Sequence, residues 1–320
     1  MWTKPYDMKE GFLIGGGLIF AGLMLELSVG PVNWDAFRWP VNGVVLAGFL
    51  ALIAIIFLLR KRVYGFQFIG TYKAAIPALV YAVVLTIIMG LTRQKSLSPG
   101  PSPMDEGSLW INYMLNFWPF VLIYVYVAVI LGQIILRRAL RSSSARLLPT
   151  GRKNSKLSSL NLKRDIPFLL NHLGLFLAMT TATLGNADMQ RLKMITVKGE
   201  AEWRALTSQQ QIVEMPIAIE LKEFIMETYD DGSPRCFASD IQILTKSGKN
   251  IQTTVEVNKP VEVDGWKIYQ YGYDTQMGAM SQTSILELVS DPWLPLVYTG
   301  IYMMLAGAVC MFILGGRKRV

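Results

Sequence analysis

Residues 166–184 read IPFLLNHLGLFLAMTTATL, and residues 217–222 read IAIELK. The first stretch is apolar over almost its whole length, which suits an α-helix crossing the roughly 30 Å hydrocarbon core of a bilayer. The second stretch alternates apolar and polar residues, which is the period of a β-strand with one buried face. The chain therefore combines membrane-spanning helices with a sheet outside the membrane.

Five further apolar runs have a length similar to that of residues 166–184. The 320 residues are 52% hydrophobic and only 17% charged, against roughly 25% charged residues in an ordinary soluble domain, so a soluble enzyme is excluded. Because no water reaches the membrane core, backbone groups must pair within each span, and all spans are expected to be helical. The six predicted spans are Gly11–Val29, Val41–Leu59, Ala74–Leu91, Trp118–Leu136, Ile166–Leu184 and Leu294–Leu314. The first lacks a small-x-small cleavage pattern and is expected to be an uncleaved signal anchor.

Basic residues gather after spans two, four and six, which is one side of a six-span topology. The segments are Arg60–Arg62, the loop 137–165 with nine basic residues and one acidic residue, and Arg317–Arg319. The positive-inside rule predicts a multi-pass protein of the cytoplasmic (inner) membrane with both termini in the cytoplasm. The segment Ala187–Ser290 has 10 basic and 15 acidic residues, net −5, as expected for an extracytoplasmic region. The basic loop is typical of topology and contact with anionic lipid, so no nucleic acid is expected as a partner.

The predicted fold is a polytopic α-helical membrane protein of about six helices with an antiparallel all-β domain inserted before the last helix. Turn sequences separate the alternating runs at Asp230–Gly232, Ser247–Gly248 and Asp264–Gly265, and they predict hairpins of a β-sandwich or barrel-like module. The predicted regions are a four-helix transmembrane region (1–136), a basic cytoplasmic loop (137–165), the fifth helix (166–186), the extracytoplasmic β domain (187–291), and the last helix with a basic tail (292–320).

His172 is the one histidine of the chain, and it lies well inside the fifth span. An ionisable residue at such a depth is costly and is a functional hypothesis by default. Two roles remain open from its chemistry: a hydrogen bond to a neighbouring helix, or donation of a nitrogen lone pair to a haem iron or another metal. Gly174 beside it would allow either a flat group or a second helix to approach closely.

The sequence lacks the common signatures of catalytic sites. There is no G-x-S-x-G, Walker loop, H-E-x-x-H or C-x-x-C pattern, so no catalytic residue is predicted. Trp34 and Trp39 lie between the first two spans, at their predicted outer ends. They are typical of an interfacial aromatic belt, and the alternative is a weak stacking site for a planar ligand.

The C-terminal half resembles the ResB (CcsB-type) family of system II cytochrome c biogenesis. The matching stretches are His172–Gly174 followed by Leu184–Gly185, Met215–Ile217 leading to Phe224, Asp231–Arg235 followed by Ser239–Asp240, Val257–Pro260 followed by Gly265–Gln270, and Asp291–Trp293. The segment Leu91–Gln94 after span three is also similar to short forms of the family.

This resemblance implies a role in haem transport and covalent haem attachment outside the membrane. It implies a CcsA-like haem-handling membrane partner, apocytochrome c as client, and haem b held transiently and shared with the partner. His172 would be an axial ligand of the haem iron. The chain lacks the partner's tryptophan-rich motif, so it is expected to be a non-autonomous subunit of a cytochrome c haem-lyase complex. The alternative is a non-catalytic scaffold subunit of a respiratory assembly, with His172 as a helix–helix hydrogen bond.

Overall fold

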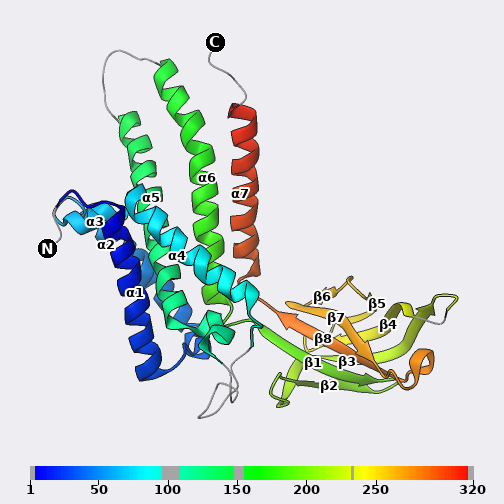
Figure 1. The fold of residues 1–320 in the computed structure, drawn as a ribbon. Helices are drawn as coiled ribbons and strands as arrows, with labels where there is room; N and C mark the ends of the chain where they lie inside the picture. The colour runs from blue at the N-terminus through cyan, green and yellow to red at the C-terminus, as the bar shows by residue number, and fades with distance from the viewer. Residues whose placement is uncertain (1–3, 96–108, 148–154, 232–233, 316–320) are drawn as a thin grey trace. The chain divides into compact units, whose positions relative to one another are not determined.

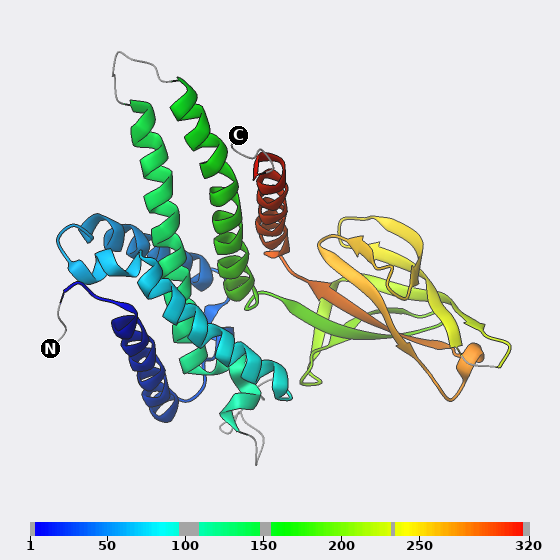
Figure 2. The same cartoon turned by 45° about the horizontal axis from the view of Figure 1, so that its top comes forward.

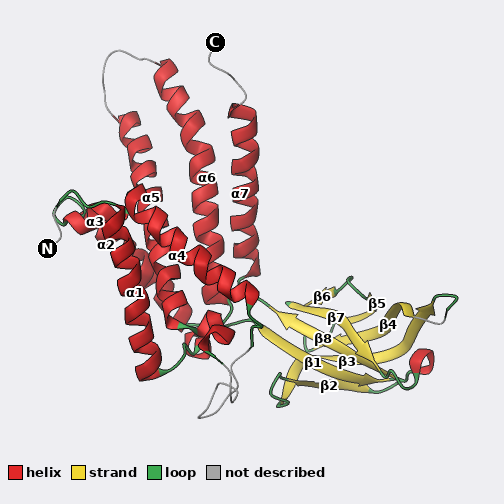
Figure 3. Cartoon of the chain, viewed as in Figure 1, coloured by secondary structure: helices red, strands yellow, loops and turns green. Residues whose placement is uncertain are grey.

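The computed structural model describes residues 4–95, 109–147, 155–231 and 234–315 (Figure 1). The chain divides into two compact units, one formed by Met1–Ala187 with Trp293–Val320 and the other by Asp188–Pro292. The first unit is helical and the second is a β-sheet (Figure 3). Gly232 of the predicted turn Asp230–Gly232 and the basic residues Arg317–Arg319 lie outside the described residues.

Within the described residues, six helices of the first unit are long and apolar enough to cross a membrane, as predicted. The helices are α1 (Met8–Val29), α2 (Val41–Leu59), α3 (Tyr64–Ile69), α4 (Tyr72–Leu91), α5 (Trp118–Leu147), α6 (Ser155–Gly185) and α7 (Leu294–Gly315), with short 3₁₀ turns η1 (Trp34–Phe37) and η2 (Trp110–Asn116). Helix α3 is too short to span, and the others carry the six spans. The predicted polytopic helical fold with an all-β insertion before the last helix is confirmed.

Helix α5 lies between two clusters of buried apolar side chains. One cluster joins it to α2 and α6 through Ile53, Val129 and Phe176. The other joins it to α3 and α4 and includes Phe68 and Ile130. Buried apolar contacts on both sides make α5 the centre of the described bundle (Figure 2).

Helices α5 and α6 extend beyond the apolar spans at the basic end of the bundle. Much of the region predicted as a loop, 137–165, is therefore helical, because α5 continues to Leu147 and α6 begins at Ser155. Arg137 has a specific structural role there. Its guanidinium donates to the carbonyl oxygens of Gly70 (2.8 Å) and Gln67 (2.7 Å) at the end of α3. A cation is favourable beside the unpaired carbonyls that end a helix, so Arg137 fixes α3 against α5.

Helices α6 and α7 approach each other at glycines. A Cβ atom added at Gly174 would lie 2.5 Å from the Gly300 carbonyl oxygen, and one added at Gly300 would lie 2.6 Å from the Gly174 carbonyl oxygen. Gly307 likewise faces the Asn171 side chain. The two backbones are therefore in direct contact, as small residues permit in membrane helix pairs.

The second unit is one antiparallel sheet of eight strands in the order β5-β4-β3-β2-β1-β8-β7-β6. The strands are β1 (Gln190–Val197), β2 (Ala201–Leu206), β3 (Ile212–Thr228), β4 (Pro234–Thr245), β5 (Asn250–Glu256), β6 (Val261–Val263), β7 (Trp266–Tyr273) and β8 (Thr283–Ser290). The predicted turn Asp264-Gly265 joins β6 to β7, and both residues have positive φ, as a two-residue hairpin turn requires.

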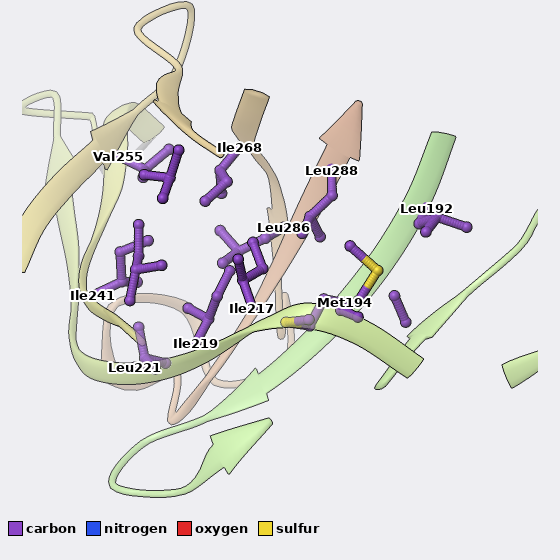
Figure 4. Packing of buried hydrophobic residues seen from close by; sticks show 14 residues of the cluster. Leu192, Met194, Ile217, Ile219, Leu221, Ile241, Val255, Ile268, Leu286 and Leu288 are labelled. Carbon is purple, nitrogen blue, oxygen red and sulfur yellow. The ribbon is translucent and has the colours of Figure 1, made fainter. Parts of the chain in front are cut away.

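The sheet curls around its own hydrophobic core (Figure 4). The alternating residues Ile217, Ile219 and Leu221 of β3 are almost fully buried, as the two-residue period predicts. The β4–β5 turn and the β6–β7 turn lie near opposite ends of the strand order, yet Lys249 Nζ lies 2.6 Å from Asp264 Oδ1. This ion pair shows that the two ends of the strand order approach each other, so the sheet is curved like a barrel around the shared core.

A buried polar network crosses the inside of the curled sheet. Ser284 Oγ accepts a hydrogen bond from Ser239 Oγ (2.7 Å) and another from Gln270 Nε2 (3.0 Å). All three residues are buried, and Ser239 and Ser284 are fully so. The network ties β4, β7 and β8 together, because each polar atom depends on the others for its hydrogen bonds.

Ser284→Ala is expected to destabilise the chain by about 1–3 kcal/mol, because the buried groups of Ser239 and Gln270 lose a partner without gaining water. The measurement is the thermal unfolding midpoint of the full chain in detergent. Ser208→Ala, which truncates an exposed serine in the turn before β3, is the control and is expected to leave the midpoint unchanged. Equal midpoints for both variants would show that the network adds nothing to stability.

Candidate functional site

The His172 side chain is oriented by its own helix. Its Nδ1 lies 2.8 Å from the Phe168 carbonyl oxygen, one turn earlier in α6. A carbonyl oxygen only accepts hydrogen bonds, so Nδ1 carries the proton in the neutral ring and Nε2 keeps its lone pair. A backbone carbonyl on one ring nitrogen is the arrangement that orients the other nitrogen of a metal-binding histidine.

Aromatic and charged side chains extend from His172 toward the polar end of α6. The Phe168 ring stacks on the imidazole, with centroids 3.8 Å apart and planes at 20°. The Arg138 guanidinium, from α5, lies 5.0 Å from the Phe168 ring centroid. Arg138 Nη2 also pairs with Asp165 Oδ1 at 2.6 Å, and Asp165 is only 7% exposed. We call Arg138, Asp165, Phe168 and His172 the α5–α6 cluster.

Sequence reasoning identified His172 but missed the other three members of this cluster. Asp165, Phe168 and His172 follow a spacing of three and four residues, which places them on one face of a helix. That spacing could have identified Asp165 and Phe168 from the sequence as neighbours of His172 on α6. Arg138 stood within a basic run that predicted only topology, and its pairing with Asp165 depends on how α5 packs against α6.

The glycine beside His172 serves helix packing. Gly174 contacts Gly300, and a Cβ atom there would also lie 3.0 Å from Met303 Cβ and from Met304 Cγ. Of the two possibilities left open by the sequence, the approach of a second helix is therefore the one observed. That face of α6 is covered by α7.

Trp34 is held in place by the backbone of a neighbouring turn. Its Nε1 donates to the Leu115 carbonyl oxygen of η2 at 3.0 Å, and its ring lies 5.4 Å from the Phe37 ring. Asn33 starts the η1 turn by accepting a hydrogen bond from the Asp35 N–H. These contacts give Trp34 a structural role in joining η1 to η2.

Trp39 is exposed, at 69%, and its ring lies over Gly43 of α2. At this end of the bundle, Asn42 Nδ2 donates to the Leu184 carbonyl oxygen at the end of α6. His172 lies twelve residues before Leu184, which is about 18 Å along a helix at roughly 1.5 Å per residue. His172 thus lies in the middle of α6, about 18 Å along the helix from the end near Trp39, and the two residues do not form one site.

The α5–α6 cluster has the donor set that a haem iron accepts from a protein. Neutral imidazole is a common axial ligand, and here its Nε2 lone pair is fixed by the bond at Nδ1. Among the described residues no group of three or more His, Cys, Asp or Glu side chains is close enough to hold a metal ion. A single nitrogen ligand beside an aromatic ring would suit a metal held mainly by its own macrocycle.

A family model matches the part of the chain that holds the α5–α6 cluster. Residues 136–287 match the ResB-like family model. A curated relative, the cytochrome c biogenesis protein CcsB of Prochlorococcus marinus subsp. pastoris, is 27% identical over 119 residues, which are 37% of this chain and 27% of that protein. The chain thus matches about a quarter of the relative's length. The solved cytochrome c haem lyase CcmF covers 85% of this chain with 45% of its own, at 14% identity and a TM-score of 0.36.

Proposed function

We propose that this chain, which matches the ResB-like family model over residues 136–287, is a haem-handling and apocytochrome-presenting subunit of a system II cytochrome c synthase. It would act in the cytoplasmic membrane with a CcsA-like partner. The observation that carries the proposal is the orientation of His172, whose Nδ1 is bound to the Phe168 carbonyl oxygen within the family-matched region. The cytochrome c biogenesis name of a relative supports the same process.

The residues of α6 would hold haem b at an early stage of its transfer. His172 would hold the iron through Nε2, and the hydrogen bond at Nδ1 would keep the ring from rotating away. Haem supplies the iron and the porphyrin side chains to which apocytochrome thiols are joined. Phe168 restricts the imidazole from one side through its stacked ring. The sequence shown has one histidine, so a second histidine ligand, where one is used, would come from outside these 320 residues.

The β unit would present the apocytochrome. It begins at Asp188, directly after α6, and ends at Pro292, directly before α7, so the chain enters and leaves it through two spanning helices. The positive-inside rule favours an extracytoplasmic β unit and cytoplasmic termini, with His172 nearer the cytoplasmic side. Covalent attachment outside the membrane would then follow haem transfer from α6 through the partner.

Deletion of the gene is expected to remove mature c-type cytochromes while leaving b-type cytochromes in place. The measurement is a haem stain of membrane proteins beside reduced-minus-oxidised spectra, with the wild-type gene restored on a plasmid as control. The physical reason is that haem b is held without covalent bonds, whereas covalent attachment requires the synthase. Normal c-type cytochromes in the deletion strain would rule out the proposed function and favour a scaffold role.

A further inference from the structure

We propose that Arg138 binds a carboxylate of the ligand held by His172, and that Asp165 fills this position when the ligand is absent. The inference rests on the proposed function and adds a recognition residue to it. The ligand class is an amphipathic metal macrocycle with free carboxylate side chains. Arg138 would bind the carboxylate edge of the ligand while His172 binds its metal.

The geometry of the α5–α6 cluster supports this assignment. The Phe168 ring lies close to both groups: its centroid is 5.0 Å from Arg138 Cζ and 3.8 Å from the centroid of the His172 ring. A macrocycle is a rigid plate with its metal at the centre and its carboxylates at one edge. Arg138 and His172 both lie close to the Phe168 ring. Arg138 is therefore suitably placed to bind a carboxylate at the edge of a macrocycle whose metal is bound by His172.

The ion pair of Arg138 leaves a hydrogen-bond donor available. Nη2 lies 2.6 Å from Asp165 Oδ1, and neither that oxygen nor the buried Arg138 Nε has a hydrogen-bond partner among the described residues. A buried donor without an acceptor costs free energy that an added acceptor would recover. The guanidinium is a planar fork of five donors and suits a carboxylate that binds through two oxygens.

The position of the cluster along the span also suits an amphipathic ligand. Arg138 lies close to the end of the apolar segment Trp110–Leu140, and Asp165 begins the segment Asp165–Gly185. His172 lies seven residues deeper, about 10 Å along the helix. The carboxylates of the ligand would lie at the polar end of the span beside Arg138. Its macrocycle would lie deeper, among apolar side chains, so both parts would be favourably solvated.

The neighbouring arginine is not equivalent to Arg138. Arg137 donates to the carbonyl oxygens of Gly70 and Gln67 and thereby holds α3. Arg138 instead faces a single carboxylate, which a ligand carboxylate of the same chemistry can replace. This difference makes Arg138 the candidate among the two adjacent cations.

The test compares ferric haem with its dimethyl ester, which has the same metal and ring but no free carboxylate. Each is titrated into the detergent-purified full chain, and binding is followed by the Soret band. Wild type is expected to bind haem about tenfold more tightly than the ester, the effect of roughly one charge-assisted hydrogen bond. Arg138→Gln is expected to bring this ratio close to one with little change in ester affinity.

Two further variants complete the experiment. Arg138→Lys keeps the charge and the ion pair with Asp165, and is expected to retain part of the preference if Arg138→Gln does not fold. Lys61→Gln removes an exposed cation after α2, and is expected to retain the full preference. Thermal midpoints are measured for every variant so that unfolding is recognised.

Equal binding of haem and ester by wild type, or equal losses of both in a folded Arg138→Gln variant, would overturn the role of Arg138. His172→Ala tests the metal instead of the carboxylate. An unchanged spectrum in that variant would remove the proposed iron ligand, whatever the ester ratio. Failure of wild type to bind either compound would overturn both proposals.

Discussion

Replacing His172 by alanine is expected to remove most of the haem absorption from the purified complex and to abolish maturation of c-type cytochromes. The variant loses the nitrogen lone pair that the Phe168 carbonyl oxygen orients. Removing only the outer partners of a metal ligand typically weakens binding by roughly 10–100-fold, so loss of the ligand itself should cost at least about tenfold. Haem affinity from Soret titration and the amount of holocytochrome in membranes are the two measurements.

The matched control for this variant is Asn171→Ala. Asn171 Nδ2 donates to the Pro167 carbonyl oxygen one turn earlier, as His172 does to that of Phe168. The control therefore removes the same kind of side-chain bond to the helix without removing an imidazole. It is expected to keep the haem band.

Rescue with free imidazole provides a second check on His172. Added imidazole is expected to restore part of the Soret band of His172→Ala, because it supplies the missing nitrogen. If His172→Ala keeps normal haem content and normal cytochrome levels, the ligand assignment is wrong. The His172 imidazole would then contribute only to the structure of α6, and a scaffold role would describe the chain better.

Gly174→Leu is expected to separate α6 from α7 and to destabilise the chain by at least about 3 kcal/mol. A side chain at this position meets the backbone oxygen of Gly300 at 2.5 Å from its first carbon, so the helix itself must shift. Overpacking commonly costs about 1–3 kcal/mol when only side chains move, and backbone displacement raises that cost. The thermal midpoint of the full chain in detergent measures the effect.

Gly48→Leu is the control for helix packing. Gly48 lies in α2, is exposed, and a Cβ atom there would have no heavy atom within 4 Å. The same substitution should therefore leave stability unchanged or raise it slightly through better helix propensity. Similar midpoints for Gly174→Leu and Gly48→Leu would mean that the α6–α7 contact is looser than the glycine packing indicates.

The sequence by itself determined the elements of this fold. An apolar run must satisfy its backbone within one helix when water is absent, so Leu294–Leu314 and the other five runs could be assigned from length alone. Alternation at Ile217, Ile219 and Leu221 likewise determined a strand with one buried face. The Asp264-Gly265 turn was predictable because positive φ is unfavourable for most other residues.

The sequence also located His172 as the residue to test, because an imidazole inside an apolar span is costly without a purpose. It suggested Trp34 and Trp39 as well, through their shared position between two spans. The tertiary structure separates these candidates: Trp34 is bound to η2, and Trp39 lies near the C-terminal end of α6, about three turns from His172. The predicted topology could place Trp34 and Trp39 between the first two spans, but it could not show which side chains they contact.

Only the tertiary structure decided which charged residues act together. Arg137 and Arg138 are adjacent and identical in the sequence, yet one holds α3 and the other pairs with Asp165 beside Phe168. Neighbouring residues of a helix point about 100° apart, so the packing of other helices around α5 decides their partners. The ion pair between Lys249 and Asp264 likewise depends on tertiary packing, because it joins turns near opposite ends of the strand order. Local patterns fix backbone conformation through short-range forces, whereas these contacts join segments whose proximity exists only after the helices and strands have packed.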